Sequence, residues 1–131
     1  MTASPRVWRA ATIAWAAVIL ASGLLPTQSA VEAISGGRDD AVTTAGHFAA
    51  YVLLAFLLGV ALNGRQTRAG ALIAGFVLAV ALGGLIELVQ APLPYRDAQV
   101  SDFIVDVIGA AVGLALFSGL AWGGRSRGRR G

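Results

Sequence analysis

The sequence has no cysteine and no lysine, and only 13% of its 131 residues are charged. The lack of cysteine excludes disulfide bridges, cysteine-ligated zinc or iron–sulfur sites, and thiol nucleophiles. Soluble domains carry about 25% charged residues, so this composition argues against an ordinary soluble domain. Disorder is excluded as well, because the chain is 56% hydrophobic and disordered segments combine low hydrophobicity with high net charge.

The few charged residues leave four long apolar stretches, at about 7–25, 45–62, 69–89 and 103–122. A helix needs about 20 mainly apolar residues to cross the hydrocarbon core of a bilayer. Four buried core helices of a soluble protein would leave too little polar surface to cover them. We therefore predict an all-α fold: a four-helix transmembrane bundle that forms a single domain over residues 1–131.

The first apolar stretch has a second interpretation, as a signal peptide. Arg6 and Arg9 precede it, and small residues lead to a cleavage position after Ala30. Gln28, however, stands where a small residue is wanted before the cut. We therefore favour a retained span.

The arginines are divided unequally between the two sides of such a bundle. Two of them, Arg38 and Arg96, lie in the first and third loops. The other eight lie at the N-terminus, in the second loop and in the C-terminal tail: Arg6, Arg9, Arg65, Arg68, Arg125, Arg127, Arg129 and Arg130. The positive-inside rule therefore predicts that both termini are cytoplasmic, in a bacterial-type inner membrane. We interpret the basic tail as a contact for anionic lipid head groups and expect no nucleic-acid partner.

Polar residues interrupt three of the apolar stretches near their extracytoplasmic ends. They form pairs on one face of each helix, three or four residues apart: His47 and Tyr51, Glu87 and Gln90, Asp102 and Asp106. Ionisable groups inside a span are energetically costly and are usually paired or functional. We predict that these residues converge on one extracytoplasmic-facing site; a purely structural hydrogen-bond network is the alternative.

An enzyme could use these residues for acid–base chemistry. His47 would be the general base, oriented by Asp102 or Asp106, with Glu87 as the acid. A divalent cation bound by His47 and the carboxylates is a metal-assisted variant. The substrate would be a lipid head group or a lipid-linked cell-wall precursor.

A binding or accessory protein could use the same residues without turnover. Arg96 would clamp a phosphate or carboxylate, and Tyr51 and Gln90 would complete the contacts to a lipid, a lipid-linked precursor or a glycopeptide. A proton or ion pathway is a third possibility, but the inner halves of the spans carry no matching acids. We favour the binding role over catalysis.

Small residues recur at helical spacing along three of the spans. They are Ala10, Ala14, Ala17 and Ala21 in the first, Gly75, Ala79 and Gly83 in the third, and Gly109 and Gly113 in the fourth. In lipid, small residues let helices approach closely. We expect helix–helix contacts along all three stripes, while the oligomeric state stays open.

The polar motifs, in this order, resemble those of the VanZ-like family. They are His47-Phe48-x-x-Tyr51, Glu87-x-x-Gln90, Pro94-x-Arg96 and Asp102-x-x-x-Asp106-x-x-Gly109-x-x-x-Gly113. The chain departs from the family pattern at Thr43-Thr44, where many members have Asp-Lys, and at Asp106, where Asn is common. The resemblance covers residues 45–116. It implies a small multi-span membrane protein with a role at the cell envelope, in a family named after a teicoplanin-resistance accessory protein, and it implies no particular reaction.

Overall fold

The computed structural model describes residues 4–25, 40–94 and 100–127. They form four helices: α1 (Pro5–Leu24), α3 (Asp40–Leu62), α4 (Arg68–Gln90) and α5 (Val100–Arg127). Each helix overlaps one predicted span and is long and apolar enough to cross a membrane. The all-α, four-helix membrane bundle is therefore confirmed. The cleavage position considered after Ala30 lies outside the described residues.

Local sequence signals explain where the helices begin and end. Pro5 occupies the first turn of α1, where its missing N–H is not needed. Gly64 takes φ +91° in the turn between α3 and α4, a conformation that glycine adopts readily. Thr67 then caps α4, because its hydroxyl accepts a hydrogen bond of 3.1 Å from the Gly70 N–H. α3 and α4 thus form a tight antiparallel hairpin.

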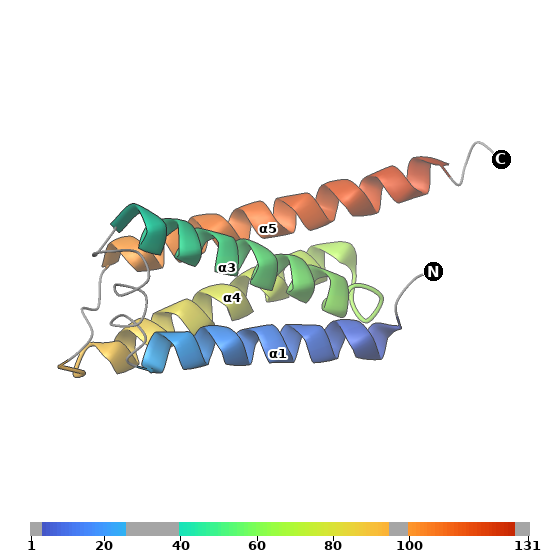
Figure 1. Cartoon of the computed structure of the whole chain (residues 1–131). Helices are drawn as coiled ribbons and strands as arrows, with labels where there is room; N and C mark the ends of the chain where they lie inside the picture. Colours follow the sequence, from blue (N-terminus) through green and yellow to red (C-terminus); the bar gives the residue numbers. More distant parts are fainter. Residues whose placement is uncertain (1–3, 26–39, 95–99, 128–131) are drawn as a thin grey trace.

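The helices pack side by side, with α3 and α4 between α1 and α5 (Figure 1). α3 and α4 each contact the other three helices, whereas α1 and α5 do not contact each other within the described residues. The start of α1, the α3–α4 turn and the end of α5 lie at one end of the bundle, which we call the arginine-rich end. The opposite end, which holds Glu87, Asp102 and Asp106, is called the acidic end.

Glycines on α5 lie closest to the backbone of a neighbouring helix, and the small residues of α4 are buried, as predicted. A Cβ atom on Gly113 would lie 2.1 Å from the carbonyl oxygen of Val52, and one on Gly109 would lie 2.8 Å from that of Phe48. The α4 residues Gly75, Ala79 and Gly83 are all buried. On α5 the missing side chains let the backbone of α3 approach closely.

The small-residue contact predicted for α1 is wrong. Ala10, Ala14, Ala17 and Ala21 are all exposed. α1 packs instead through Thr12, Trp15 and Ile19, and the Trp15 Nε1–H donates a hydrogen bond of 3.0 Å to the Ala50 carbonyl on α3. Alanine is distributed around most of α1, so it does not mark a face. The large indole and isoleucine side chains determine which face is buried, because they fill the space beside α3.

Large aliphatic side chains cover the outside of the bundle. Ile13 on α1, Ile73 and Leu88 on α4, and Leu120 on α5 are each about two-thirds or more exposed, at 70%, 67%, 75% and 69%. Surfaces of this kind are unfavourable in water when they are extensive. In a bilayer they contact the hydrocarbon chains. The chain is therefore an integral membrane protein.

Candidate functional site

The centre of the candidate site is a contact between α3 and α5 at the acidic end. Asp106 lies one turn before Gly109, which packs against the backbone of Phe48. This close approach places Asp106 beside His47, so that His47 Nδ1 and Asp106 Oδ1 are 3.1 Å apart. The Asp106 side chain is only 3% exposed, whereas His47 is 31% exposed. A buried carboxylate is therefore in contact with a partly exposed imidazole.

Tyr51 and Gly83 complete the surroundings of Asp106. The Tyr51 hydroxyl, one turn after His47, forms a hydrogen bond with the Asp106 carboxyl group. A Cβ atom on Gly83 of α4 would lie 3.2 Å from both that hydroxyl and Asp106 Oδ2. The sequence indicated Gly83 only as a packing residue. Its position one turn before Glu87 is the signal that could have placed it in the site.

Asp102 lies on the other side of the imidazole. Its Oδ2 is 3.9 Å from His47 Nε2, which is beyond hydrogen-bond distance. The Asp102 side chain is 17% exposed. The structure therefore brings His47, Tyr51, Asp102 and Asp106 into one cluster, as the sequence predicted; whether they bind a ligand stays a prediction.

The two polar residues of α4 are placed differently from each other. Glu87 is half-buried and close enough to interact electrostatically with His47 and Tyr51. Gln90 is 6% exposed and its Nε2 donates a hydrogen bond of 2.7 Å to the Gly23 carbonyl at the end of α1. The structure thus gives Gln90 a contact that joins two helices, and its ligand-binding role stays a prediction.

Two further predictions concern Arg96 and a divalent cation. Arg96 lies outside the described residues. Among the residues that the structure does describe, no group of three or more histidine, aspartate or glutamate side chains is arranged to hold a metal ion. We therefore assign no metal ligands, and the involvement of a cation stays a prediction.

Comparisons with known proteins bear on the resemblance noted in the sequence. Neither a curated protein nor a solved structure matches the chain. A family model described as VanZ/LLP1 matches residues 4–122, which include all four helices up to Trp122. This match extends well beyond the polar motifs and confirms the resemblance. The chain belongs to the VanZ/LLP1 family.

Proposed function

We propose that this protein binds the polar head of an amphiphile at the acidic end of the bundle, as a binding or accessory protein of the cell envelope. One observation carries the proposal: the partly exposed His47 contacts the buried Asp106 through Nδ1, while its Nε2 lies 3.9 Å from Asp102. An ionisable cluster within a membrane protein is costly unless it is paired or functional. In this cluster His47 Nδ1 is paired with Asp106, whereas Nε2 has no hydrogen bond to Asp102.

The position of the cluster favours an amphiphilic ligand. His47 lies in the second turn of α3 and Asp102 in the first turn of α5, so both are near the boundary between hydrocarbon and water. An imidazole between carboxylates offers a donor and acceptors to hydroxyl, amine or phosphate groups. A lipid head group, a lipid-linked cell-wall precursor or a glycopeptide such as teicoplanin presents such groups at this depth.

A second candidate function is that of a membrane-embedded enzyme acting on a lipid head group or lipid-linked precursor. The observation that favours it is the His47–Asp106 contact of 3.1 Å. When Asp106 is ionised it can only accept hydrogen bonds, so Nδ1 carries the proton in this contact. Nε2 is then the basic nitrogen, and it can remove a proton from a bound hydroxyl group or water. Glu87 would be the corresponding acid.

Replacing His47 with asparagine tests both functions. The asparagine amide can still donate to Asp106 but offers nothing in the place of Nε2. We expect about tenfold weaker binding, which corresponds to about 1.4 kcal/mol, at an unchanged unfolding temperature. Binding of a labelled anionic phospholipid, a lipid-linked cell-wall precursor and teicoplanin would be measured with the purified protein in nanodiscs.

The control for this experiment is Ala49→Asn, which places the same side chain at an exposed position of α3. Equal affinity of wild-type protein and His47→Asn for every probe that binds, or no binding of any probe, contradicts the proposal. If a product forms from one of the probes and the His47→Asn variant binds that probe without converting it, the enzyme function is the correct one.

We also propose that the acidic end faces the outside of the inner membrane. The arginines of α1, the α3–α4 turn and the tail favour a cytoplasmic location of the opposite end. Because the chain has no cysteine, single-cysteine variants can report on this. In intact cells a membrane-impermeant maleimide should label Ala91→Cys, just after α4, and leave Gln66→Cys, in the α3–α4 turn, unlabelled. The reverse pattern contradicts the orientation, and permeabilised cells provide the control in which both are labelled.

A further inference from the structure

Arg9 is a charged residue on the side of α1 that packs into the bundle. Arg9, Thr12, Ala16 and Ile19 follow one another at steps of three or four residues, so they share one face of the helix. Thr12 and Ile19 are buried, and Arg9 is partly buried. The Arg9 Nε atom is buried and has no hydrogen-bond partner within residues 4–25, 40–94 and 100–127. A buried donor of a charged group is unfavourable without an acceptor, so these residues leave the guanidinium incompletely paired.

Contacts at the other end of α1 indicate the depth of Arg9. A Cβ atom on Gly23 would lie 2.9 Å from Ile86 Cγ2 on α4. α1 and α4 run in the same direction (Figure 1), and Arg9 lies about four turns before Gly23. Counting back equally far from Ile86 ends about one turn inside Arg68. Because long side chains on a helix extend toward its N-terminus, the Arg9 guanidinium reaches toward the arginine-rich surface of the bundle.

The segments that form the arginine-rich end contain no acidic residue. The sequence has no aspartate or glutamate at 1–31, at 41–86 or after 106, and these stretches hold the start of α1, the α3–α4 turn and the end of α5. Arg68 donates hydrogen bonds to the carbonyl and hydroxyl oxygens of Ser118 on α5, which are neutral acceptors. The positive end of the α1 dipole adds to the charge of this region. These segments therefore offer no carboxylate side chain to Arg9.

We propose that Arg9 binds the phosphate group of an anionic phospholipid in the leaflet at the arginine-rich end. A guanidinium is suited to phosphate because it can donate two parallel hydrogen bonds. Ile13, one turn farther along α1, is 70% exposed, so a molecule beside Arg9 in a bilayer has hydrocarbon next to its head. A phospholipid fits this position better than free phosphate. The site lies at the opposite end of the bundle from His47 and does not rest on the proposed function.

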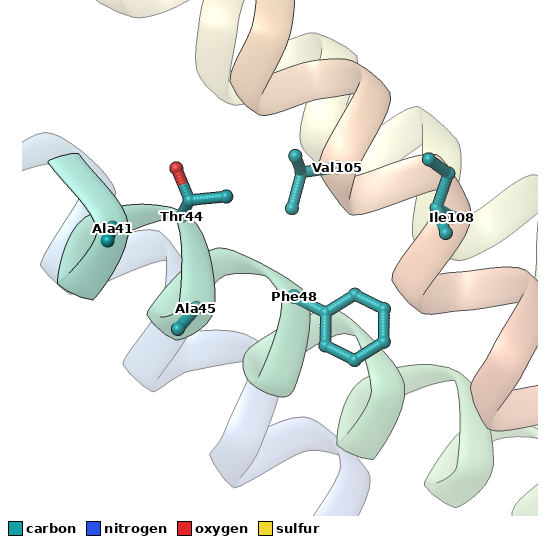
Figure 2. Close-up of a pocket in the computed structure, with 6 residues that line it drawn as sticks. All are labelled: Ala41, Thr44, Ala45, Phe48, Val105 and Ile108. Atoms are coloured by element: carbon teal, nitrogen blue, oxygen red, sulfur yellow. The ribbon is translucent and has the colours of Figure 1, made fainter.

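The charge of Arg9 is what identifies the class of ligand. The apolar groove between α3 and α5 (Figure 2) is lined by no charged side chain, so its surface does not favour one amphiphile over another. The positive charge of Arg9 favours anionic over zwitterionic head groups. The basic tail attracts the same lipids without a fixed geometry, whereas Arg9 would hold one head group in a defined place.

The experiment measures phosphatidylglycerol bound to the full-length protein by native mass spectrometry from detergent, with phosphatidylcholine and inorganic phosphate as alternative ligands. Arg6 provides the matched control, because it is an exposed arginine one turn earlier on the same helix. Arg9→Gln and Arg6→Gln remove the same charge from the same region, so a general effect of charge is similar in both. We expect phosphatidylglycerol to bind about tenfold more weakly to Arg9→Gln and with nearly unchanged affinity to Arg6→Gln.

Thermal unfolding separates ligand binding from a structural role of Arg9. Arg9→Gln removes an incompletely paired charge, so in a neutral detergent without lipid this variant should unfold at the wild-type temperature or above it. Added phosphatidylglycerol should raise the unfolding temperature of the wild-type protein and of Arg6→Gln, but not that of Arg9→Gln. If Arg9→Gln is already less stable without lipid, Arg9 serves the packing of α1 and the inference is overturned.

Three further results overturn the inference. Equal losses of phosphatidylglycerol in Arg9→Gln and Arg6→Gln mean that the attraction is a general effect of charge. Equal affinity for phosphatidylcholine, or displacement of phosphatidylglycerol by inorganic phosphate, means that the site does not select an anionic lipid. His47→Asn should leave this binding unchanged. If His47→Asn loses it while Arg9→Gln retains it, the lipid lies at the acidic end, so this inference fails and the proposed function stands.

Discussion

Replacing Gly113 with alanine is expected to destabilise the bundle by about 2–3 kcal/mol. The new Cβ would lie 2.1 Å from the Val52 carbonyl oxygen and 3.0 Å from the carbonyl carbon. Both are backbone atoms inside a helix, so neither can rotate away as a flexible side chain can. α3 and α5 must therefore separate. Thermal unfolding of the purified protein in detergent measures the loss.

Gly119→Ala is the matched control on the same helix. Among the described residues, no heavy atom beyond the adjoining backbone of α5 lies within 4 Å of a Cβ atom built at this position. Alanine is favoured over glycine in a helix by about 1 kcal/mol, so the control should unfold at the same temperature as the wild-type protein or above it. If Gly113→Ala is as stable as Gly119→Ala, the close approach of α3 and α5 is wrong.

Gly113→Ala should also impair the candidate site. Gly109 and Gly113 hold α5 against the backbone of α3 on the side where Asp106 meets His47. Moving the helices apart by even a fraction of an ångström lengthens a contact that is 3.1 Å long. We therefore expect Gly113→Ala to weaken ligand binding, although no ligand is expected to touch this residue.

The parts of the fold that could be predicted depend on residues whose effect is the same in any bundle. A run of about 20 apolar residues must be a span because nothing else covers its backbone in lipid. The pair Gly109 and Gly113 indicated a close contact because two glycines one turn apart leave a flat helix surface. The i, i+4 spacing of His47 with Tyr51 and of Asp102 with Asp106 gave each pair a common face, and the four side chains do meet.

The features of the fold and the site that could not be predicted depend on which neighbouring helix each helix face packs against. Alanines on α1 fit either side of that helix, so only the packing of Trp15 shows which side is buried. Glu87 and Gln90 are three residues apart, which rotates one from the other by about 60° around α4. That rotation is enough to turn Gln90 to the Gly23 carbonyl on α1 while Glu87 stays near His47. Spacing along one helix contains no information about the positions of the other helices.

Asp106→Ala is expected to destabilise the protein by about 3 kcal/mol and to abolish ligand binding. The substitution removes the hydrogen-bond partner of His47 Nδ1 and that of the Tyr51 hydroxyl. Leaving a buried polar group without its partner costs about 1–3 kcal/mol, and here two groups are affected. Unfolding temperature and binding of the labelled phospholipid, the precursor and teicoplanin would be measured on the same preparation.

Asp106→Asn separates the structural role of this residue from its charge. The asparagine carbonyl can accept from His47 Nδ1 and its amide can donate to the Tyr51 hydroxyl, so we expect a loss of stability below about 1 kcal/mol. If binding persists in Asp106→Asn, Asp106 serves to orient the imidazole; if binding is lost at full stability, its negative charge is required. A stable Asp106→Ala variant with normal binding would contradict the structural role of the buried carboxylate. Asp102 would then be the only carboxylate that could orient His47 for the proposed role.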